Sequence, residues 1–387
     1  MRKIPDMLDM IRELVAIPSV SSSNPDLDLG NRPVVEHLAG WLETLGFATE
    51  LLPLPGQPQK ANLVASLGQG DGGLVLAGHT DTVPFDEGRW RSDPFSATVR
   101  DDRIYGLGTS DMKTFLAIAA DVSAEFTARR PVRPLTLLAT ADEECSMSGA
   151  RSLAESGHPR ARYAVVGEPT GLRPVRMHKG IMMERLRVLG ASGHSSDPTL
   201  GRNALEGMHR VLGALLELRK TLQRDNRNPA FHVDRPTLNL GHIHGGDNPN
   251  RICPECELHF DLRMLPGMQI ETLRRQLRAA AAQALEGSGL ELDYAPLFDG
   301  VPAMETPADS AVIRAAESLT GATAGAVDFG TEGPFFSRMG METLILGPGD
   351  IEQAHQPDEY LALDRIEPMR EILRQLVQRF CFEAEVD

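Results

Sequence analysis

Several side chains that can bind metal ions or transfer protons follow predicted strands directly. His79 ends an apolar run that begins at Leu74 and is typical of a buried parallel strand, and Asp81 lies two positions later. Ligands bind at the carboxyl ends of the strands of an open α/β sheet. An Asp in this position can hydrogen-bond one imidazole nitrogen and leave the other free for a metal ion. A loop His beside a capping Asp fits the same two positions, so the rest of the chain has to decide.

Further residues of the same kind occupy other strand ends and turns. They are Asp111 after a glycine-rich turn, Glu143 and Glu144 after a predicted strand over 135–141, Glu168 after one over 163–166, and His355 in the loop 347–357. Carboxylates gathered at the strand ends of one sheet repel one another strongly unless cations hold them. Mixed nitrogen and oxygen ligands suit Zn²⁺, with Co²⁺ and Mn²⁺ as other candidates. The sequence therefore predicts a metal centre.

Glu143 and Glu144 are adjacent, and on an extended chain neighbouring side chains point to opposite sides. We expect one of them to bind metal while the other holds a water molecule. This division fits hydrolysis by a metal-activated water with a carboxylate as general base.

The elements that would position these side chains alternate between helix and strand. Helical spacing of apolar residues covers 7–15, 34–45, 115–126, 310–319 and 366–380, and short apolar runs cover 47–51, 62–67, 74–79, 135–141, 163–166 and 343–346. A hairpin is predicted around Asp101 and Asp102. This alternation indicates an α/β fold with a doubly wound, mostly parallel sheet flanked by helices.

The pattern changes after about residue 179. A strand over 256–264 alternates apolar and polar residues, as strands of antiparallel sheets with one wet face do, and helices are predicted over 204–215 and 270–285. We predict an inserted α+β domain over 179–288. The first domain would then comprise 1–178 and 289–387, including a strand over 290–294.

Length and composition exclude several classes of protein. The 387 residues suffice for two domains, and the net charge of −15 argues against a nucleic-acid partner or an anionic membrane surface. No apolar run approaches the roughly 20 residues of a membrane span. The N-terminus lacks an apolar signal segment, so we expect a cytoplasmic location. Four cysteines form no disulfide framework, and Cys253 and Cys256 have no second pair with which to make a structural zinc site.

Nine motifs together resemble the M20 family of co-catalytic metallohydrolases. They are AGHTDTVPFDEGRW, YGLGTSDMK, ATADEE, GEPT, HKG, SGHSSDP, TLNLGHIHGGDNPNRIC, LPGM and GPGDIEQAHQPDEY, spread over nearly the whole chain. The resemblance implies a metal-dependent aminopeptidase-like catalytic domain with an inserted lid that also forms a homodimer. It also implies two divalent metal ions, Zn²⁺ with Co²⁺ as a substitute. One residue departs from the pattern, because Thr114 stands where relatives commonly have Gly.

The resemblance also assigns roles to individual residues. His79 and Glu168 would bind one metal, Glu144 and His355 the other, Asp111 would bridge both, Asp81 would orient His79, and Glu143 would be the general base and acid. A cis peptide is expected between Asp111 and Met112. His194 would reach the partner subunit's active site and stabilise the oxyanion, Arg251 and Asn239 would hold the substrate α-carboxylate, and Glu332 would contribute to recognising the ornithine side chain.

The implied activity is hydrolysis of the amide of N2-acetyl-L-ornithine to L-ornithine and acetate in arginine biosynthesis. A succinyl-diaminopimelate desuccinylase or a broad N-acyl-L-amino-acid deacylase would use the same metal set, so spacing alone does not separate these substrates. A non-catalytic amino-acid-binding relative is the alternative of a different class. It would have no need of both Glu143 and Glu144. The roles of His242 and His244 are left open.

Overall fold

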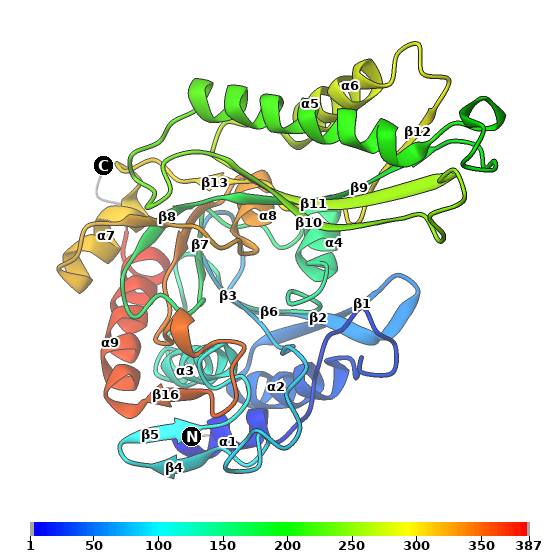
Figure 1. Ribbon diagram of the computed structural model, residues 1–387. Coiled ribbons are helices and arrows are strands. Elements are labelled where there is room, and N and C mark those ends of the chain that lie inside the picture. Colours follow the sequence, from blue (N-terminus) through cyan, green and yellow to red (C-terminus); the bar gives the residue numbers. More distant parts are fainter. Residues whose placement is uncertain (1–3, 385–387) are drawn as a thin grey trace. The chain divides into compact units, whose positions relative to one another are not determined.

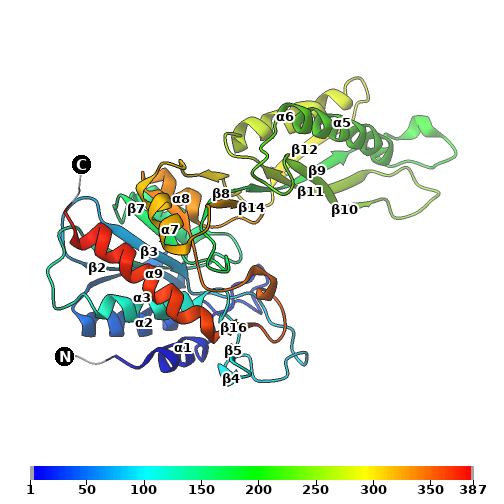
Figure 2. The same ribbon diagram turned by 90° about the vertical axis from the view of Figure 1, so that its left-hand side faces the viewer.

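The computed structural model describes residues 4–384, which form two compact units (Figures 1 and 2). The first unit comprises the chain up to Arg176, Thr306–Gly325, and the chain from Thr331 onward; the second comprises Met177–Glu305 and Ala326–Gly330. The expectation that the first domain resumes at residue 289 is wrong. The reason is that β12 (Glu291–Pro296) pairs antiparallel with β9 (Gly180–Leu189), inside the second unit.

A mixed sheet forms the centre of the first unit. Its strands run in the order β1-β2-β6-β3-β7-β15, and the start of β8 pairs with the end of β15. The bounds are β1 Ala48–Leu54, β2 Gln57–Leu67, β3 Leu74–His79, β6 Leu135–Thr140, β7 Tyr163–Val166, β8 Val175–His178 and β15 Glu342–Ile345. Parallel pairing, predicted for most of the sheet, is confined to β6, β3, β7 and β15; β1 and β2 join antiparallel.

Helices cover both faces of this sheet. The first layer holds α1 (Met7–Val15), α2 (Arg32–Leu45), α3 (Lys113–Ala124) and α9 (Ile366–Val377), with α7 (Ala311–Thr320) against α9. The other face carries α4 (Ser148–Ser156) and α8 (Gly333–Arg338), which pack on one another (Figure 1). Every residue of β3 and β6 is buried, as their largely apolar sequences predict.

The close packing of α3 on β3 depends on Gly78. A Cβ atom at this position would lie 2.6 Å from Cε of Met112 and 3.2 Å from a methyl carbon of Leu116, both in or next to α3. Because no side chain intervenes, α3 lies directly against the strand that ends in His79. The turn before this helix is thereby brought to the same end of the sheet as His79.

The second unit is an antiparallel sheet covered by two helices. The strand order is β10-β11-β9-β12, with β10 at Thr237–Gly245 and β11 at Glu255–Met264. Helices α5 (Ala204–Asp225) and α6 (Ile270–Ala284) pack on one face through an apolar cluster that includes Leu258, Phe260 and Leu277. The predicted α+β character of this region is confirmed.

Short strands complete the chain. A hairpin of β4 (Thr98–Arg100) and β5 (Arg103–Tyr105), as predicted, is extended by β16 (Tyr360–Ala362), while β13 (Met304–Glu305) and β14 (Gly325–Val327) pair with β8. No helix among the described residues is long and apolar enough to cross a membrane. The four cysteines are free thiols.

Candidate metal centre

The parallel strands of the first unit bring the predicted ligands to one edge. Because β6, β3, β7 and β15 run in the same direction, their carboxyl ends lie together, and each is followed by a predicted site residue. The loop after β15 lies tightly against the loop after β7, since a Cβ atom on Gly347 would lie 2.1 Å from the carbonyl oxygen of Gly167. His355 is thereby carried to the edge that holds Glu168.

His79 is buried and held at both ring nitrogens. Its Nε2 lies 3.0 Å from Oδ1 of Asp111, and its Nδ1 lies 3.0 Å from the backbone carbonyl oxygen of Asp81. The Asp81 carboxylate was expected to orient this ring, but its Oδ1 is 3.8 Å from Nδ1. That carboxylate accepts hydrogen bonds from the backbone N–H groups of Glu143 (3.3 Å) and Glu144 (3.2 Å) instead. Asp81 thus orients the histidine through its backbone and the two glutamates through its side chain.

Asp111 lies between the two histidines. Its Oδ1 faces His79, and its Oδ2 is 3.5 Å from Nε2 of His355, which also lies 3.0 Å from Oε2 of Glu144. The peptide bond between Asp111 and Met112 is cis, as the family resemblance predicted. One carboxylate therefore has an oxygen directed to each side of the centre, which is the geometry a bridging ligand needs.

Glu143 and Glu144 do not diverge as an extended chain would make them. Residues 143–146 form a turn that begins after Asp142, whose backbone is left-handed with φ +64°. The side chains of both glutamates reach His79, with ligand atoms within 4.8 Å of one another. The expectation of opposite directions is wrong because the chain leaves the strand before Glu143.

The predicted ligands form overlapping groups whose ligand atoms lie within 4.8 Å of one another. These are His79 with Glu143 and Glu144; His79 with Asp111 and Glu168; and Asp111 with Glu144 and His355. The second and third groups share Asp111. The structure thus brings together all five predicted ligands and the predicted base, in sets that suit two neighbouring cations.

The electrostatics of the centre favour cations. Burial raises the pKa of Glu143 and of Glu168 well above the usual carboxyl range, and the Glu168 and Asp111 carboxylates, respectively, add to these shifts. Burial likewise raises the pKa of Glu144. Burial opposes ionisation of Asp111 too, but hydrogen bonds from His355 and His79 hold its pKa well below the usual value. Hydrogen bonds to Asp111 and Glu144 raise the pKa of His355 to about 10.

One buried oxygen tests whether this set fits a metal ion. Oε1 of Glu168 is buried and has no hydrogen-bond partner among residues 4–384. A divalent cation between His79, Asp111 and Glu168 would satisfy it, and mixed imidazole and carboxylate donors suit Zn²⁺, Co²⁺ or Mn²⁺. The residues present therefore fit the expected metal.

Glu332 lies beside this centre, fully buried. Its Oε2 accepts a hydrogen bond from the Thr140 hydroxyl (2.7 Å), while its Oε1 has no hydrogen-bond partner in the described part of the chain. Burial raises the pKa of Glu332 to about 7. Thr114, the departure from the family pattern, is buried in the first turn of α3, and nothing in the structure explains it.

Glu359 belongs to the support of the centre, and the reasoning from the sequence did not select it. Its buried carboxylate accepts hydrogen bonds from the backbone N–H groups of Gly108 (2.9 Å), Ser110 (2.7 Å) and Asp111 (3.0 Å). Burial raises the pKa of Glu359 to about 8, and the three N–H groups oppose that rise. It ties the loop that follows His355 to the turn that presents Asp111. The signal that could have found Glu359 is its charge four positions after the predicted ligand His355.

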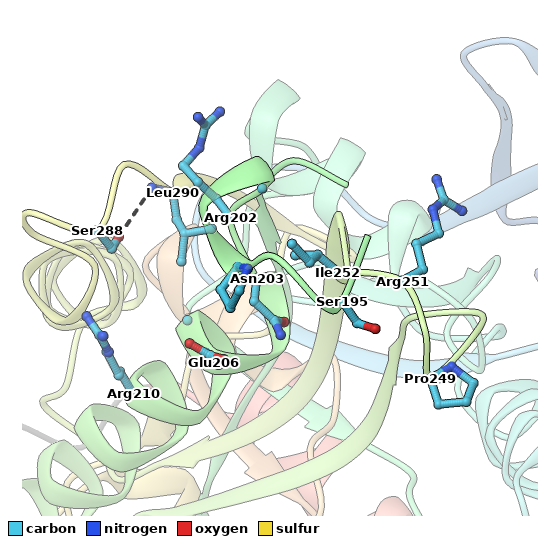
Figure 3. A pocket seen from close by; sticks show the side chains of 13 residues that line it. Ser195, Arg202, Asn203, Glu206, Arg210, Pro249, Arg251, Ile252, Ser288 and Leu290 are labelled. Carbon is cyan, nitrogen blue, oxygen red and sulfur yellow. Dashed lines mark hydrogen bonds between the residues drawn. The ribbon is translucent and has the colours of Figure 1, made fainter. Parts of the chain in front are cut away.

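The remaining predicted residues lie in the second unit. His194 and Arg251 are neighbours on paired backbone segments, while Asn239 lies apart from them on β10. Arg251, ion-paired with Asp247, lines a cavity of about 360 Å³ (Figure 3). Figure 3 shows Ser195 and Arg251 on one side of this cavity and Arg210 and Ser288 on the other. The structure therefore places His194, expected to act on the oxyanion, beside Arg251, whereas Asn239, the other residue expected to hold the α-carboxylate, is on a different strand.

Comparisons with known proteins agree with this description. A family model described as peptidase family M20/M25/M40 matches residues 75–379. The acetylornithine deacetylase of Pasteurella multocida (strain Pm70) is 48% identical over 381 residues, which cover 98% of this chain and 100% of that protein. The crystal structure of a Staphylococcus aureus tripeptidase has a TM-score of 0.75 at 21% identity, covering 96% of this chain and 97% of its own.

A further solved structure is that of a Bacillus subtilis protein, described as a dinuclear metal binding peptidase from the M20 family. Its TM-score is 0.68 at 15% identity, with 96% of each chain covered. At these identities the two solved structures establish the likeness of fold.

Metal binding is expected to release protons. The raised pKa values of Glu144, Glu168 and His355 mean that these groups keep protons to a higher pH than usual, and each must lose its proton to bind a cation. Affinity should therefore fall as the pH is lowered, by about tenfold per pH unit for each proton released. Calorimetric titration of chelated protein with Zn²⁺, in two buffers of different ionisation enthalpy, measures the release. Equal heats in the two buffers would contradict it.

Replacing Glu359 is expected to weaken the metal centre. In Glu359→Gln, an amide N–H₂ group would face backbone N–H groups that now donate to a carboxylate, so Asp111 would lose its fixed position. Metal affinity should fall by about 10- to 100-fold, as for other residues that hold metal ligands in place. Equilibrium dialysis with Co²⁺ measures this. The control is Glu352→Gln, an exposed residue of the same loop, and equal affinities of the two variants would refute the role.

Proposed function

The chain belongs to peptidase family M20/M25/M40, a family of hydrolases, and from this premise we propose that it hydrolyses the amide of N2-acetyl-L-ornithine to L-ornithine and acetate. The single observation that carries the substrate is the 48% identity, over nearly the whole of both chains, to the Pasteurella multocida acetylornithine deacetylase. The reaction would serve arginine biosynthesis in the cytoplasm. The clustered ligands and the adjacent glutamate supply the means of hydrolysis.

Two divalent cations, Zn²⁺ or Co²⁺ in its place, would occupy the centre. His79, Asp111 and Glu168 would hold one, and Asp111, Glu144 and His355 the other. When bound, such ions polarise a carbonyl and lower the pKa of water. The buried, negatively charged setting explains why cations are needed before the carboxylates can all ionise.

Glu143 would move the protons of the reaction. Its side chain lies against His79 and Glu144, and its pKa is raised well above the usual range by burial and by the charge of Glu168. A carboxylate with a raised pKa is a better proton acceptor near neutral pH than an exposed one. A carboxylate oxygen of Glu143 would take a proton from the attacking water and deliver it to the leaving amine nitrogen.

His194 would stabilise the oxyanion of the tetrahedral intermediate in the partner subunit. Its Nδ1 accepts the backbone N–H of Ser196 (3.2 Å) and lies 2.7 Å from the Ser196 hydroxyl. With Nδ1 serving as acceptor, the ring proton of a neutral imidazole is on Nε2. The exposed Nε2–H is then free to donate to a developing negative charge.

Substrate recognition would divide between Arg251, Asn239 and Glu332. The guanidinium of Arg251 suits a carboxylate because its planar fork can bind both oxygens, and Asn239 would add an amide donor. Glu332 would interact with the ornithine amine through Oε1, the carboxylate oxygen that has no partner among the described residues. The second unit would serve as the lid and form the homodimer that brings His194 to its partner.

The first measurement is a substrate comparison. Metal-loaded protein should hydrolyse N2-acetyl-L-ornithine in preference to N-succinyl-L,L-diaminopimelate and N-acetyl-L-methionine, as judged by kcat/KM, and chelation should abolish the reaction. Preference for another acyl amino acid would overturn the substrate and leave the hydrolase class intact. A metal-loaded protein inactive on all three would favour the amino-acid-binding alternative.

Replacing the proposed base should separate catalysis from metal binding. Glu143→Ala removes the proton acceptor and leaves the residues of both proposed metal sites in place. These are His79, Asp111 and Glu168 in one site, and Asp111, Glu144 and His355 in the other. We expect turnover to fall by about 10²- to 10⁴-fold, the usual contribution of general acid–base catalysis, with unchanged metal content. Activity is measured by acetate release and metal content by atomic emission. A comparable rate in Glu143→Ala would exclude this role.

A further inference from the structure

We propose that Lys60 and Asp142 are positioning residues that together fix the turn carrying Glu143 and Glu144. The inference rests on the proposed function, because it concerns how the proton acceptor Glu143 is held. Neither residue is a metal ligand, and both are almost fully buried, with 3% of the surface of each exposed.

Asp142 determines the shape of the turn. Its backbone is left-handed, with φ +64°, a conformation that a non-glycine residue adopts only where the surroundings support it. Its carbonyl oxygen accepts the N–H groups of Ser146 (3.1 Å) and Met147 (2.6 Å), which closes the turn. Its carboxylate accepts the hydroxyls of Ser146 and Ser148, the latter at 2.8 Å. The two glutamates therefore lie within a loop that is tied at both ends to one side chain.

Lys60 holds that side chain in place. Its Nζ donates to the Asp142 carboxylate and lies 2.8 Å from Oδ1 of Asp28. A buried carboxylate without a cationic partner is strongly unfavourable, and the carboxylates of the metal centre add further negative charge at this edge of the sheet. Because Lys60 is on β2, it anchors the turn to a rigid strand that carries no metal ligand.

The turn is thus held from two directions. On one side, Asp81 accepts the backbone N–H groups of Glu143 and Glu144; on the other, Lys60 and Asp142 fix the start of the turn. If the charge of Lys60 is removed, the Asp142 carboxylate has to move or take up water, and the turn moves with it. A small displacement of a proton acceptor lowers turnover more than it lowers substrate binding.

The chain contains a reporter for this movement that is independent of turnover. Cys145 lies within the turn and is exposed, whereas Cys253, Cys256 and Cys381 are buried. In the folded protein, the rate at which an aromatic disulfide reagent modifies a thiol should therefore report the conformation around Cys145. A purely structural role of Lys60 would change global stability without changing this rate under native conditions.

The experiment compares Lys60→Met and Lys60→Arg with the control Lys220→Met, an exposed lysine of α5 that pairs with Glu217. For Lys60→Met we expect kcat on N2-acetyl-L-ornithine to fall by about 10- to 100-fold. KM should stay near that of the unaltered protein, metal affinity should fall because the same turn carries Glu144, and Cys145 should react several times faster. Lys60→Arg, which keeps the charge, should restore much of kcat and bring the Cys145 reaction rate back toward that of the unaltered protein. Lys220→Met should change neither quantity.

A folded Lys60→Met with unchanged kcat and an unchanged thiol rate overturns the proposal. A lower kcat with a changed KM and a lower metal content, but with an unchanged thiol rate, also overturns it. If Lys60→Met does not fold, Ser148→Ala decides, since it removes a single hydrogen bond to Asp142 and should produce the same changes to a smaller degree. Absence of hydrolysis by the unaltered protein would refute the proposed function, and the thiol rates would still decide how the turn is held.

Discussion

Repulsion among buried carboxylates is the constraint on which the catalytic unit depends. Asp111, Glu143, Glu144 and Glu168 gather at one edge of a sheet, out of contact with most solvent. In a medium of low dielectric constant these charges cannot coexist without cations or protons, and the raised pKa values of the glutamates express that conflict. The two imidazoles offset part of it through Asp111. Two divalent ions would offset the remaining repulsion, so the carboxylates would lose their protons as the metal ions bind.

Such a site requires ligands that are already in place before the metal binds. In this structure the loops that carry the ligands are held by hydrogen bonds to other residues. Two of these loops are tied by buried charged groups that are not themselves predicted ligands. Asp81 accepts the N–H groups of the glutamate turn, and Glu359 accepts those of the turn before Asp111. Lys60 neutralises Asp142 at the start of the glutamate turn. Buried side chain to backbone hydrogen bonds of this kind fix a loop more firmly than surface contacts do, because breaking them leaves polar groups without water.

The division of the chain into two units separates tasks with different physical demands. The predicted metal ligands all belong to the first unit, whose central parallel strands are buried on both faces and therefore rigid. His194 and Arg251 belong to the second unit, where both are exposed and lie opposite each other in an isolated β-bridge. The predicted metal ligands thus all come from one unit, and all but the exposed His355 are buried or half-buried. Of the residues proposed to act on substrate, His194, Arg251 and Asn239 come from the other unit, while the buried Glu332 belongs to the first.

The sequence by itself indicated the candidate ligands, the candidate base and most helices and strands, because apolar periodicity and the residue types at strand ends are local properties. It also indicated the inserted unit, but it assigned the strand at 291–296 to the wrong unit, since the partner of a strand is a long-range property. Only the tertiary structure decided that Glu143 and Glu144 share one turn, that Asp81 meets His79 through its backbone, and that Glu359 and Lys60 support the site. The contacts of Lys60 with Asp142 and of Glu359 with Gly108 join residues 82 and 251 positions apart. No local pattern records which distant backbone a buried charge will meet, because burial and pairing arise only when the whole sheet has formed.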